Sequence, residues 1–429
     1  MNTYKHPGLI LLVLLMCPAM ASQANGVNDV RFATFNASLN RTNAGDLVTE
    51  LAVPGSAQPA TIAEIIQRTN PDVLLLNEFD FDPNGTAAAS FQSNYLGVSQ
   101  NGAPTVNYPY VYSAPSNTGI ASGFDLDNNG FLGGPNDAFG FGGFEGQFGM
   151  VLYSKHPILT ADVRTFQNFL WRDMPGALLP GDPDNVSPDN PDWFSAAELD
   201  VVRLSSKSHW DVPIQIGGET VHVLASHPTP PVFDGNEDRN GLRNSDEIRF
   251  WSDYITPGAT SAYIYDDVET DAAPSGGLQA NDKFVILGDQ NSDPFDGDSL
   301  PGSIGQLLAN PLVNTSVTPS SLGAPEDALA EGGANVGQLG DPAFDTADFN
   351  PATPGNIRAD YALPSNNMAI NGAGVFWPVQ ADPLSALTGN FPFPGSDHRL
   401  VYVDVNVPEP TSLILLLCGL AGIATRRRV

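Results

Sequence analysis

The feature that most constrains this chain is a series of short apolar runs, most of which end at a polar residue. Runs of four to eight residues rich in Val, Ile, Leu and Phe are typical of strands buried in a sheet. They occur at residues 30–35, 71–80, 149–154, 220–227, 283–288, 358–363 and 399–405. Helical patterns at 61–68, 244–255 and about 303–309 separate them. The order predicts one elaborated domain with a mixed α/β fold.

The helix expected at 244–255 has both a start signal and a buried stripe. Asn244 followed by Glu247 resembles a capping box, in which two side chains satisfy free backbone donors at a helix start. Ile248, Trp251 and Ile255 recur at helical spacing. We therefore expect the helix to begin at Asn244 and to pack its apolar stripe on the core.

Polar residues able to bind a metal or a phosphate stand where the apolar runs end. They are Asn36, Glu78, His227, Asp289 with Asn291, and Asp360, while Asp397 and His398 precede the last strand. Taken singly, each is more simply a solvated strand end, a structural histidine or a cap. Taken together, they indicate one site, because α/β folds build their sites in the loops at strand ends.

The run "FVILGDQNSDP", residues 284–294, ends a strand with an acid and an amide two positions apart. Residues two apart on a strand face the same side. If the extended geometry persists, Asp289 and Asn291 point into one space. The alternative is a simple turn, because Gly, Asp, Asn and Pro all favour turns.

With these pieces in order, the sequence resembles the endonuclease/exonuclease/phosphatase superfamily. The matching pieces are "TFN" (34–36), "NPDVLLLNEF" (70–79), "LASH" (224–227), "GDQNSDP" (288–294), "DYAL" (360–363) and "GSDHRLV" (395–401). The resemblance implies a DNase I-like α/β (α+β) fold over residues 25–407, a four-layered sandwich of two mostly antiparallel sheets flanked by helices. Two departures from the family are the long Gly/Asp-rich loops and the scarcity of basic residues.

The resemblance implies a divalent-metal-dependent hydrolase of phosphodiester bonds, a nuclease or a small phosphodiester hydrolase. Glu78 would bind Mg²⁺ or Mn²⁺, ions that prefer oxygen ligands. Asn36 would assist at that metal, and Asp397 would bind the same ion or a second one.

The resemblance also implies roles for the other polar residues. Asp289 would activate water or protonate the leaving group, and Asn291 and His227 would donate hydrogen bonds to the phosphoryl oxygens. His398 would contact the phosphate or act as a general base, oriented by Asp360.

The charge of the chain argues against a long polyanionic partner. It has 18 Lys and Arg against 48 Asp and Glu, a formal net charge of −30. Such a surface repels polyanions at long range. Arg243 and Arg399 are the further candidates for phosphate contact. We expect small phosphodiesters or short single strands to bind better than long duplex DNA.

Three alternative functions stay open: a phosphomonoesterase, a lipid phosphodiesterase, or a non-catalytic Ca²⁺-binding extracellular matrix protein. "DLDNNG", 125–130, begins like a calcium loop, but its twelfth position is Asn136 in place of Glu. It predicts either a structural Ca²⁺ site or a solvated loop. The aromatic run "FGFGGFEGQF", 139–148, predicts either a substrate cleft or a packed loop.

Both ends of the chain have the composition of processing signals. Residues 1–24 have the order of a secretory signal peptide: a basic start, the apolar run "GLILLVLLMC" and small-residue cleavage sites. A membrane anchor is the alternative, but the run is short for a span.

Residues 408–429 resemble the PEP-CTERM sorting tail of bacterial exported proteins. Pro-Glu-Pro at 408–410, the apolar stretch 413–424 and three arginines follow in order. The resemblance implies a Gram-negative bacterium, transient membrane contact through the C-terminal helix, and removal of the tail by an exosortase. A simple tail anchor is the alternative. We expect an exported monomer at the cell surface, in the extracellular matrix or secreted.

Overall fold

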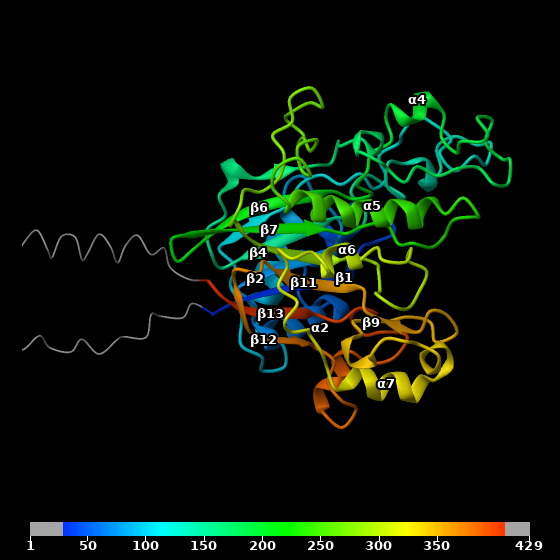
Figure 1. Ribbon diagram of the computed structural model, residues 1–429. Helices are drawn as coiled ribbons and strands as arrows, with labels where there is room; N and C mark the ends of the chain where they lie inside the picture. Colours follow the sequence, from blue (N-terminus) through cyan, green and yellow to red (C-terminus); the bar gives the residue numbers. More distant parts are fainter. Residues whose placement is uncertain (1–28, 408–429) are drawn as a thin grey trace, which may run out of the picture.

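Two sheets packed face to face form the centre of the protein, with helices on their outer faces (Figure 1). The structure is a computed structural model that describes residues 29–407. The predicted signal peptide and sorting tail lie outside the described residues. Within residues 29–407, no helix is both long enough and apolar enough to cross a membrane.

The first sheet has six strands in the order β12-β13-β1-β2-β4-β3. Their bounds are β1 (Asp29–Leu39), β2 (Val73–Phe79), β3 (Tyr110–Tyr112), β4 (Met150–Ser154), β12 (Ala369–Val375) and β13 (Val401–Asn406). Only β1 and β2 pair in parallel, and the other neighbours are antiparallel.

The second sheet has five strands in the order β11-β8-β7-β6-β5. Their bounds are β5 (Arg164–Thr165), β6 (His209–Ile216), β7 (Glu219–Ser226), β8 (Lys283–Asp289) and β11 (Asp360–Pro364). Only β7 and β8 are parallel. A separate short pair joins β9 (Ala347–Asp348) to β10 (Asn356–Ile357). Both main sheets are therefore mostly antiparallel, as predicted.

Helices cover the outer face of each sheet. Helices α1 (Asp46–Leu51), α2 (Ala57–Thr69) and α3 (Thr86–Phe91) belong to the first sheet, and α5 (Arg239–Tyr254) and α6 (Gly305–Leu308) to the second. The short α4 (Ala196–Leu199) and α7 (Gly323–Glu331) lie in the long connections (Figure 1).

Strand β2 shows why the strands are continuous apolar runs. Val73 and Leu75 pack in the cluster between the two sheets, whereas Leu74 and Leu76 pack against the helices of the first sheet. Residues next to each other on a strand point to opposite faces, so a strand buried on both faces has no polar alternation. The four-layered sandwich expected from the sequence is confirmed.

Helix α5 corrects the predicted capping box. The helix begins at Arg239, so Asn244 lies inside it, fully buried, and donates to the carbonyl oxygens of Thr229 at 2.8 Å and Gln290 at 2.9 Å. Glu247 accepts from the backbone of Thr229 at 2.6 Å. The two polar residues hold the segments that follow β7 and β8. The apolar stripe is confirmed for Ile248 and Trp251, both 0% exposed.

Both ends of the described chain leave the fold on the same side (Figure 1). Asp29, at the start of β1, pairs with Asn406, at the end of the antiparallel β13. Asn36 lies seven residues further along β1, a distance of roughly 23 Å at the usual rise per residue. The segment that enters β13 lies at that same far edge.

Candidate active site

The far edge of the two sheets brings the predicted polar residues together. The C-terminal ends of the parallel pairs β1–β2 and β7–β8 lie here, with the start of β11 and the segment before β13. Asn36 on the first sheet donates its amide to Oδ2 of Asp289 on the second sheet at 3.0 Å. The backbone N–H of Asp289 also donates to Oδ1 of Asn77 on β2 at 3.2 Å, so hydrogen bonds from two strands of the first sheet meet at Asp289.

Two of the predicted residues lie inside strands and not after them. Strand β1 continues to Leu39, three residues past Asn36, with an irregular register between the two. Ser38 in this irregular stretch has φ of 47°. Glu78 lies within β2, also at a positive φ, 57°. Non-glycine residues in this region of φ are uncommon and cluster at functional sites.

Asp289 is the centre of the site. Its Oδ2 lies 3.4 Å from Nε2 of His227 and 3.7 Å from Nε2 of His398, and its Oδ1 accepts from the backbone of Asn291 at 2.9 Å. The side chain is 1% exposed. Burial raises the pKa of Asp289, but the two imidazoles and the Asn36 amide lower it further, so the net shift is well below the usual value. Asp289 is therefore a carboxylate at neutral pH.

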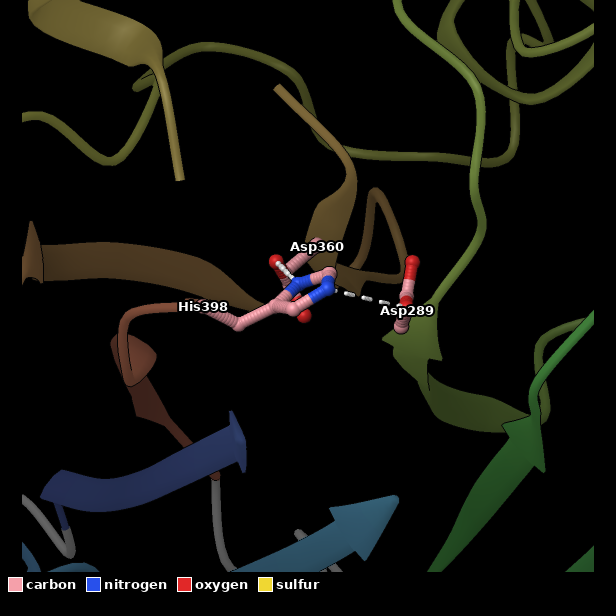
Figure 2. A group of neighbouring side chains, drawn as sticks. All are labelled: Asp289, Asp360 and His398. Carbon is pink, nitrogen blue, oxygen red and sulfur yellow. Dashed lines mark hydrogen bonds and ion pairs between the residues drawn. The ribbon is translucent and has the colours of Figure 1, made fainter. Parts of the chain in front are cut away.

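His398 is held between two carboxylates (Figure 2). Its Nδ1 lies 2.8 Å from Oδ2 of Asp360, which also accepts from the Thr346 hydroxyl at 2.9 Å. Burial lowers the pKa of His398, but the charges of Asp360 and Asp289 raise it well above that of free imidazole. His398 is thus an imidazolium at neutral pH, and each ring N–H faces a carboxylate.

The group Asp289, Asp360 and His398 has ligand atoms within 4.8 Å of one another, a spacing compatible with a metal ion. The imidazolium lies between the two acids and offsets one of their two charges (Figure 2). A cation there would compete with the proton of His398. The group is better described as an Asp–His–Asp chain, in which His398 is hydrogen-bonded to Asp360 and ion-paired with Asp289.

Asn291 reaches the site through a turn, and the extended geometry does not persist. Strand β8 ends at Asp289, and Asn291 has φ of 50°. Its side-chain amide donates to the Pro228 carbonyl at 3.2 Å. Gly288 just before has φ of 153°, and a Cβ there would lie 2.0 Å from the Ser226 carbonyl oxygen. The motif is therefore both a turn and part of the site.

Glu78 and Asp397 can offer oxygen atoms to a cation. Both are half-buried, unlike the enclosed Asp289. Oε2 of Glu78 accepts from Asn40 at 2.8 Å, and Oδ1 of Asp397 accepts only long bonds, 3.4 Å each, from the hydroxyls of Ser38 and Ser396. Across residues 29–407, the second oxygen of each carboxylate accepts no hydrogen bond. This donor set suits a hard divalent cation.

A cavity of about 540 Å³ adjoins the site, with Glu78, His227 and Asn291 among its lining residues. Phe139, Phe141 and Phe148 line it, so the aromatic run 139–148 forms a cleft wall, one of the two predicted alternatives.

Lys207 also lines this cavity and was missed by the sequence analysis. It is 7% exposed, and its Nζ lies 3.4 Å from the Pro228 carbonyl. Burial lowers the pKa of Lys207, an effect opposed by the charges of Glu247, Glu78 and Asp289. Its short sequence context, "SKSH", carries no signal that separates it from a surface lysine.

Of the two arginines proposed as phosphate contacts, the structure contradicts Arg399 and leaves Arg243 a prediction. Arg399 is 1% exposed and paired with Asp348 at 2.7 Å, so it is not available to a phosphate. Arg243 donates from Nε and Nη2 to the carbonyl oxygens of Leu204, Phe139 and Arg203, but it lines the cavity and its Nη1 makes no hydrogen bond within residues 29–407.

The loop that begins "DLDNNG" brings Asp125, Asp127 and Asp137 together, with carboxylate oxygens within 4.8 Å of one another. Asp137 directly follows Asn136, the twelfth residue of the loop. Its oxygens accept from the backbone of Leu126 and Gly133. Structural Ca²⁺ in this loop stays a prediction.

Solved structures with a similar fold have low sequence identity to this chain. An endonuclease/exonuclease/phosphatase from Beutenbergia cavernae is 17% identical, with a TM-score of 0.45, over 88% of this chain and 72% of that one. Sphingomyelinase C from Streptomyces griseocarneus is 15% identical, with a TM-score of 0.39, over 88% and 99%. A mannosyl-6-phosphatase from Bacteroides thetaiotaomicron is 12% identical, with a TM-score of 0.41, over 88% and 100%. At these TM-scores, the names carry no argument about substrate.

Two family models match the chain, whereas no curated protein does. The PEP-CTERM protein-sorting motif matches residues 406–428, which implies sorting by an exosortase. The model of the endonuclease/exonuclease/phosphatase family matches residues 33–398, a span that contains every site residue described above. The chain therefore belongs to the endonuclease/exonuclease/phosphatase family.

Proposed function

We propose that the protein is an exported, divalent-metal-dependent phosphoesterase that hydrolyses phosphodiester bonds. The observation that carries this proposal is the buried carboxylate of Asp289, faced by two imidazoles, at the sheet edge that also carries Glu78 and Asp397. Hydrolysis of a phosphate ester needs a positioned water, neutralised phosphoryl charge and a stabilised leaving oxygen. The side chains at this edge offer each of these.

Asp289 is the residue we assign to water activation. The family resemblance implies two alternative roles for Asp289: activation of water and protonation of the leaving group. Because its pKa is lowered, Asp289 is ionised at neutral pH and can accept a proton but has none to donate. It therefore suits the first role.

His398 is the residue we assign to the phosphoryl group. A general base must be free to take up a proton, and the raised pKa of His398 leaves it already protonated at neutral pH. Its Nε2–H can instead donate to a phosphoryl oxygen. Asp360, through its 2.8 Å contact with Nδ1, fixes the orientation of the ring.

His227, Asn291 and Lys207 complete the phosphate-binding end of the cavity. Burial and the neighbouring Lys207 lower the pKa of His227, although Asp289 opposes this, so His227 is a neutral donor through Nε2. The second amide proton of Asn291 and the ammonium group of Lys207 are further donors at the same end. Donors already in place where charge develops stabilise the transition state.

The metal belongs with Glu78 and Asp397, assisted by Asn36. Carboxylate and amide oxygens are the ligands that Mg²⁺ and Mn²⁺ accept, and the free oxygens of the two half-buried acids fit this preference. A bound ion would neutralise phosphoryl charge and polarise the ester.

A diester is a better substrate for this site than a monoester or a long polymer. A diester carries one negative charge, and the neighbouring cavity has room for its second ester group. A polymer would need many cationic contacts, but Arg399 is engaged within the fold and Arg239 is paired with Glu237. Binding of duplex DNA should therefore show a shallow salt dependence of roughly one to three phosphate contacts.

The test is hydrolysis of bis(p-nitrophenyl) phosphate and of p-nitrophenyl phosphate by the exported protein, with Mg²⁺, with Mn²⁺ and with EDTA. We expect faster turnover of the diester, loss of turnover with EDTA and recovery when metal is restored. Faster turnover of the monoester would favour a phosphomonoesterase. No turnover of either compound at any metal concentration would contradict the proposal.

We further propose that an exosortase removes the sorting tail during export. Pro-Glu-Pro at 408–410 marks the expected processing boundary. Mass spectrometry of the exported protein should find a C-terminus near Val407. Recovery of Arg428 in most molecules would indicate a retained tail.

A further inference from the structure

Aromatic side chains form part of the cavity lining, which is called the aromatic wall below. Six rings contribute to it: Phe139, Phe141, Phe148, Trp171, Phe194 and Phe233. A volume of about 540 Å³ is within the range of small-molecule sites in proteins. The rings and the phosphate-binding end line the same cavity, so one ligand can contact both.

Two of these phenylalanines have costly backbone conformations. Phe148 has φ of 57° and Phe233 has φ of 68°, values that are outliers for a bulky side chain. Phe233 is also 87% exposed and Phe141 is 59% exposed, so these rings gain little from burial in the fold. Strained backbone conformations of this kind cluster at active sites and ligand-binding segments.

Few cations in the cavity lining are free of an acidic partner. Arg239 is paired with Glu237, whereas Lys207 and the Nη1 of Arg243 remain for a phosphate. Lys207 lines the same cavity as Glu78 and His227. The part of a ligand that occupies the aromatic wall should be uncharged.

We infer that this cavity binds an aromatic ring carried by one ester group of the substrate, either a nucleoside base or another aryl group. The inference rests on the proposed function for the position of the phosphate. A lipid chain fits less well, because a net charge of −30 repels anionic membrane surfaces. The phosphate would lie beside Lys207, and the ring among Phe141, Phe148 and Phe233.

The test is calorimetric binding of four phosphate monoesters to the full exported protein with Mg²⁺: methyl, phenyl, decyl and thymidine 5′-phosphate. We expect the two aromatic ligands to bind at least about tenfold more tightly than methyl phosphate, since stacking of one base is typically worth about 5- to 150-fold in affinity. Tighter binding of thymidine 5′-phosphate than of phenyl phosphate would identify a nucleoside site, and the reverse order another aryl group.

Phe148→Leu and Phe233→Leu remove a ring but keep an apolar side chain. Each should weaken the aromatic ligands by about 5- to 150-fold and leave methyl phosphate unchanged. Phe391→Leu is the matched control, because Phe391 is 86% exposed and does not line the cavity. Two variants are used so that misfolding of one does not decide the result.

Three outcomes would overturn the inference: equal binding of methyl and aromatic phosphates, unchanged aromatic binding in both folded variants, or decyl phosphate binding as tightly as the aromatic ligands. The proposed function fails separately. If the aromatic ligands bind selectively but no diester is hydrolysed, the ring site stands and the phosphoesterase proposal does not.

Discussion

Two histidine–aspartate pairs have the same contact but different surroundings. His398 lies 2.8 Å from Asp360, and His222 on β7 lies 2.8 Å from Asp211 on β6. In both pairs, burial lowers the pKa of the histidine and the partner carboxylate raises it more, so the net shift is upward. The paired contact alone therefore does not identify a functional site.

The two pairs differ in what lies beyond the contact. The ring of His398 reaches a second carboxylate, Asp289, on its other side, and is 5% exposed. His222 is 21% exposed, and its partner Asp211 also accepts from the Tyr254 hydroxyl of α5 at 2.6 Å. The first pair belongs to a chain of polar groups at a cavity, whereas the second attaches a helix to the sheet.

The largest expected effect comes from the group that only the first pair has. Asp289→Asn keeps the shape of the side chain but removes the proposed base, so kcat/KM for bis(p-nitrophenyl) phosphate should fall by about 10²- to 10⁴-fold. Asp211→Asn is the matched control in the other pair and should stay within about threefold of wild type. A loss of equal size in both variants would mean that Asp289 acts through the fold.

The second-largest difference is expected between the kcat values of the two histidine variants. His398→Gln removes the imidazolium that faces the phosphate and should lower kcat by about 100-fold or more. His222→Gln should leave kcat unchanged within about twofold, because its ring does not line the cavity. Steady-state kinetics of the two variants, with circular dichroism as a check of folding, decides this. An active His398→Gln enzyme would remove His398 from the proposed mechanism.

The third prediction tests whether Asp360 and His398 act together or independently. Asp360→Ala and His398→Ala, combined, should cost little more than the larger single loss, because residues that act together lose most of their effect with the first removal. The kcat values of both single variants and the double variant give the answer. Losses that multiply would show that Asp360 does not serve His398.

The smallest expected effect is on stability as a function of pH. His398 has a raised pKa in the folded state, so its contribution to stability is lost as pH rises through that pKa. Burial raises the pKa of its partner Asp360 to about 6, so the ion pair is complete only above that pH. Urea unfolding should therefore separate wild type from His398→Gln more at pH 7 than at pH 9.

His222→Gln is the control for this pH effect and should show the same sign. Its effect should be smaller, because solvent screens a partly exposed pair. A difference between wild type and His398→Gln that does not change with pH would contradict the assigned protonation state.

Much of the fold could be predicted from the sequence because its main strands are buried on both faces. Runs such as 73–76 need no alternation of polar residues, and their length alone separates them from helices. Two strands gave no such signal. β6 contains Pro213, a residue that normally argues against a strand, and β12 is a glycine-containing edge strand in which five of seven residues are at least partly exposed.

The sequence predicted which residue types form the site but not how their side chains are arranged. The positions of Asp289 and His398 follow from their strands, so the sequence could indicate them. Asn291 reaches the cavity through a left-handed turn, and Lys207 does so through tertiary folding. Asn244 was misassigned because a polar residue that bonds distant carbonyls has the same local sequence signature as a helix cap.

The placement of the chain ends has a consequence for attachment. Asp29 and Asn406 lie side by side, and the edge that carries Asn36, Asp397 and His398 lies at the other end of the same strands. A molecule tethered by either terminus, to a bilayer or to a solid support, presents this edge outward into solvent. An enzyme immobilised through its termini should therefore keep the access to substrate that it has when free.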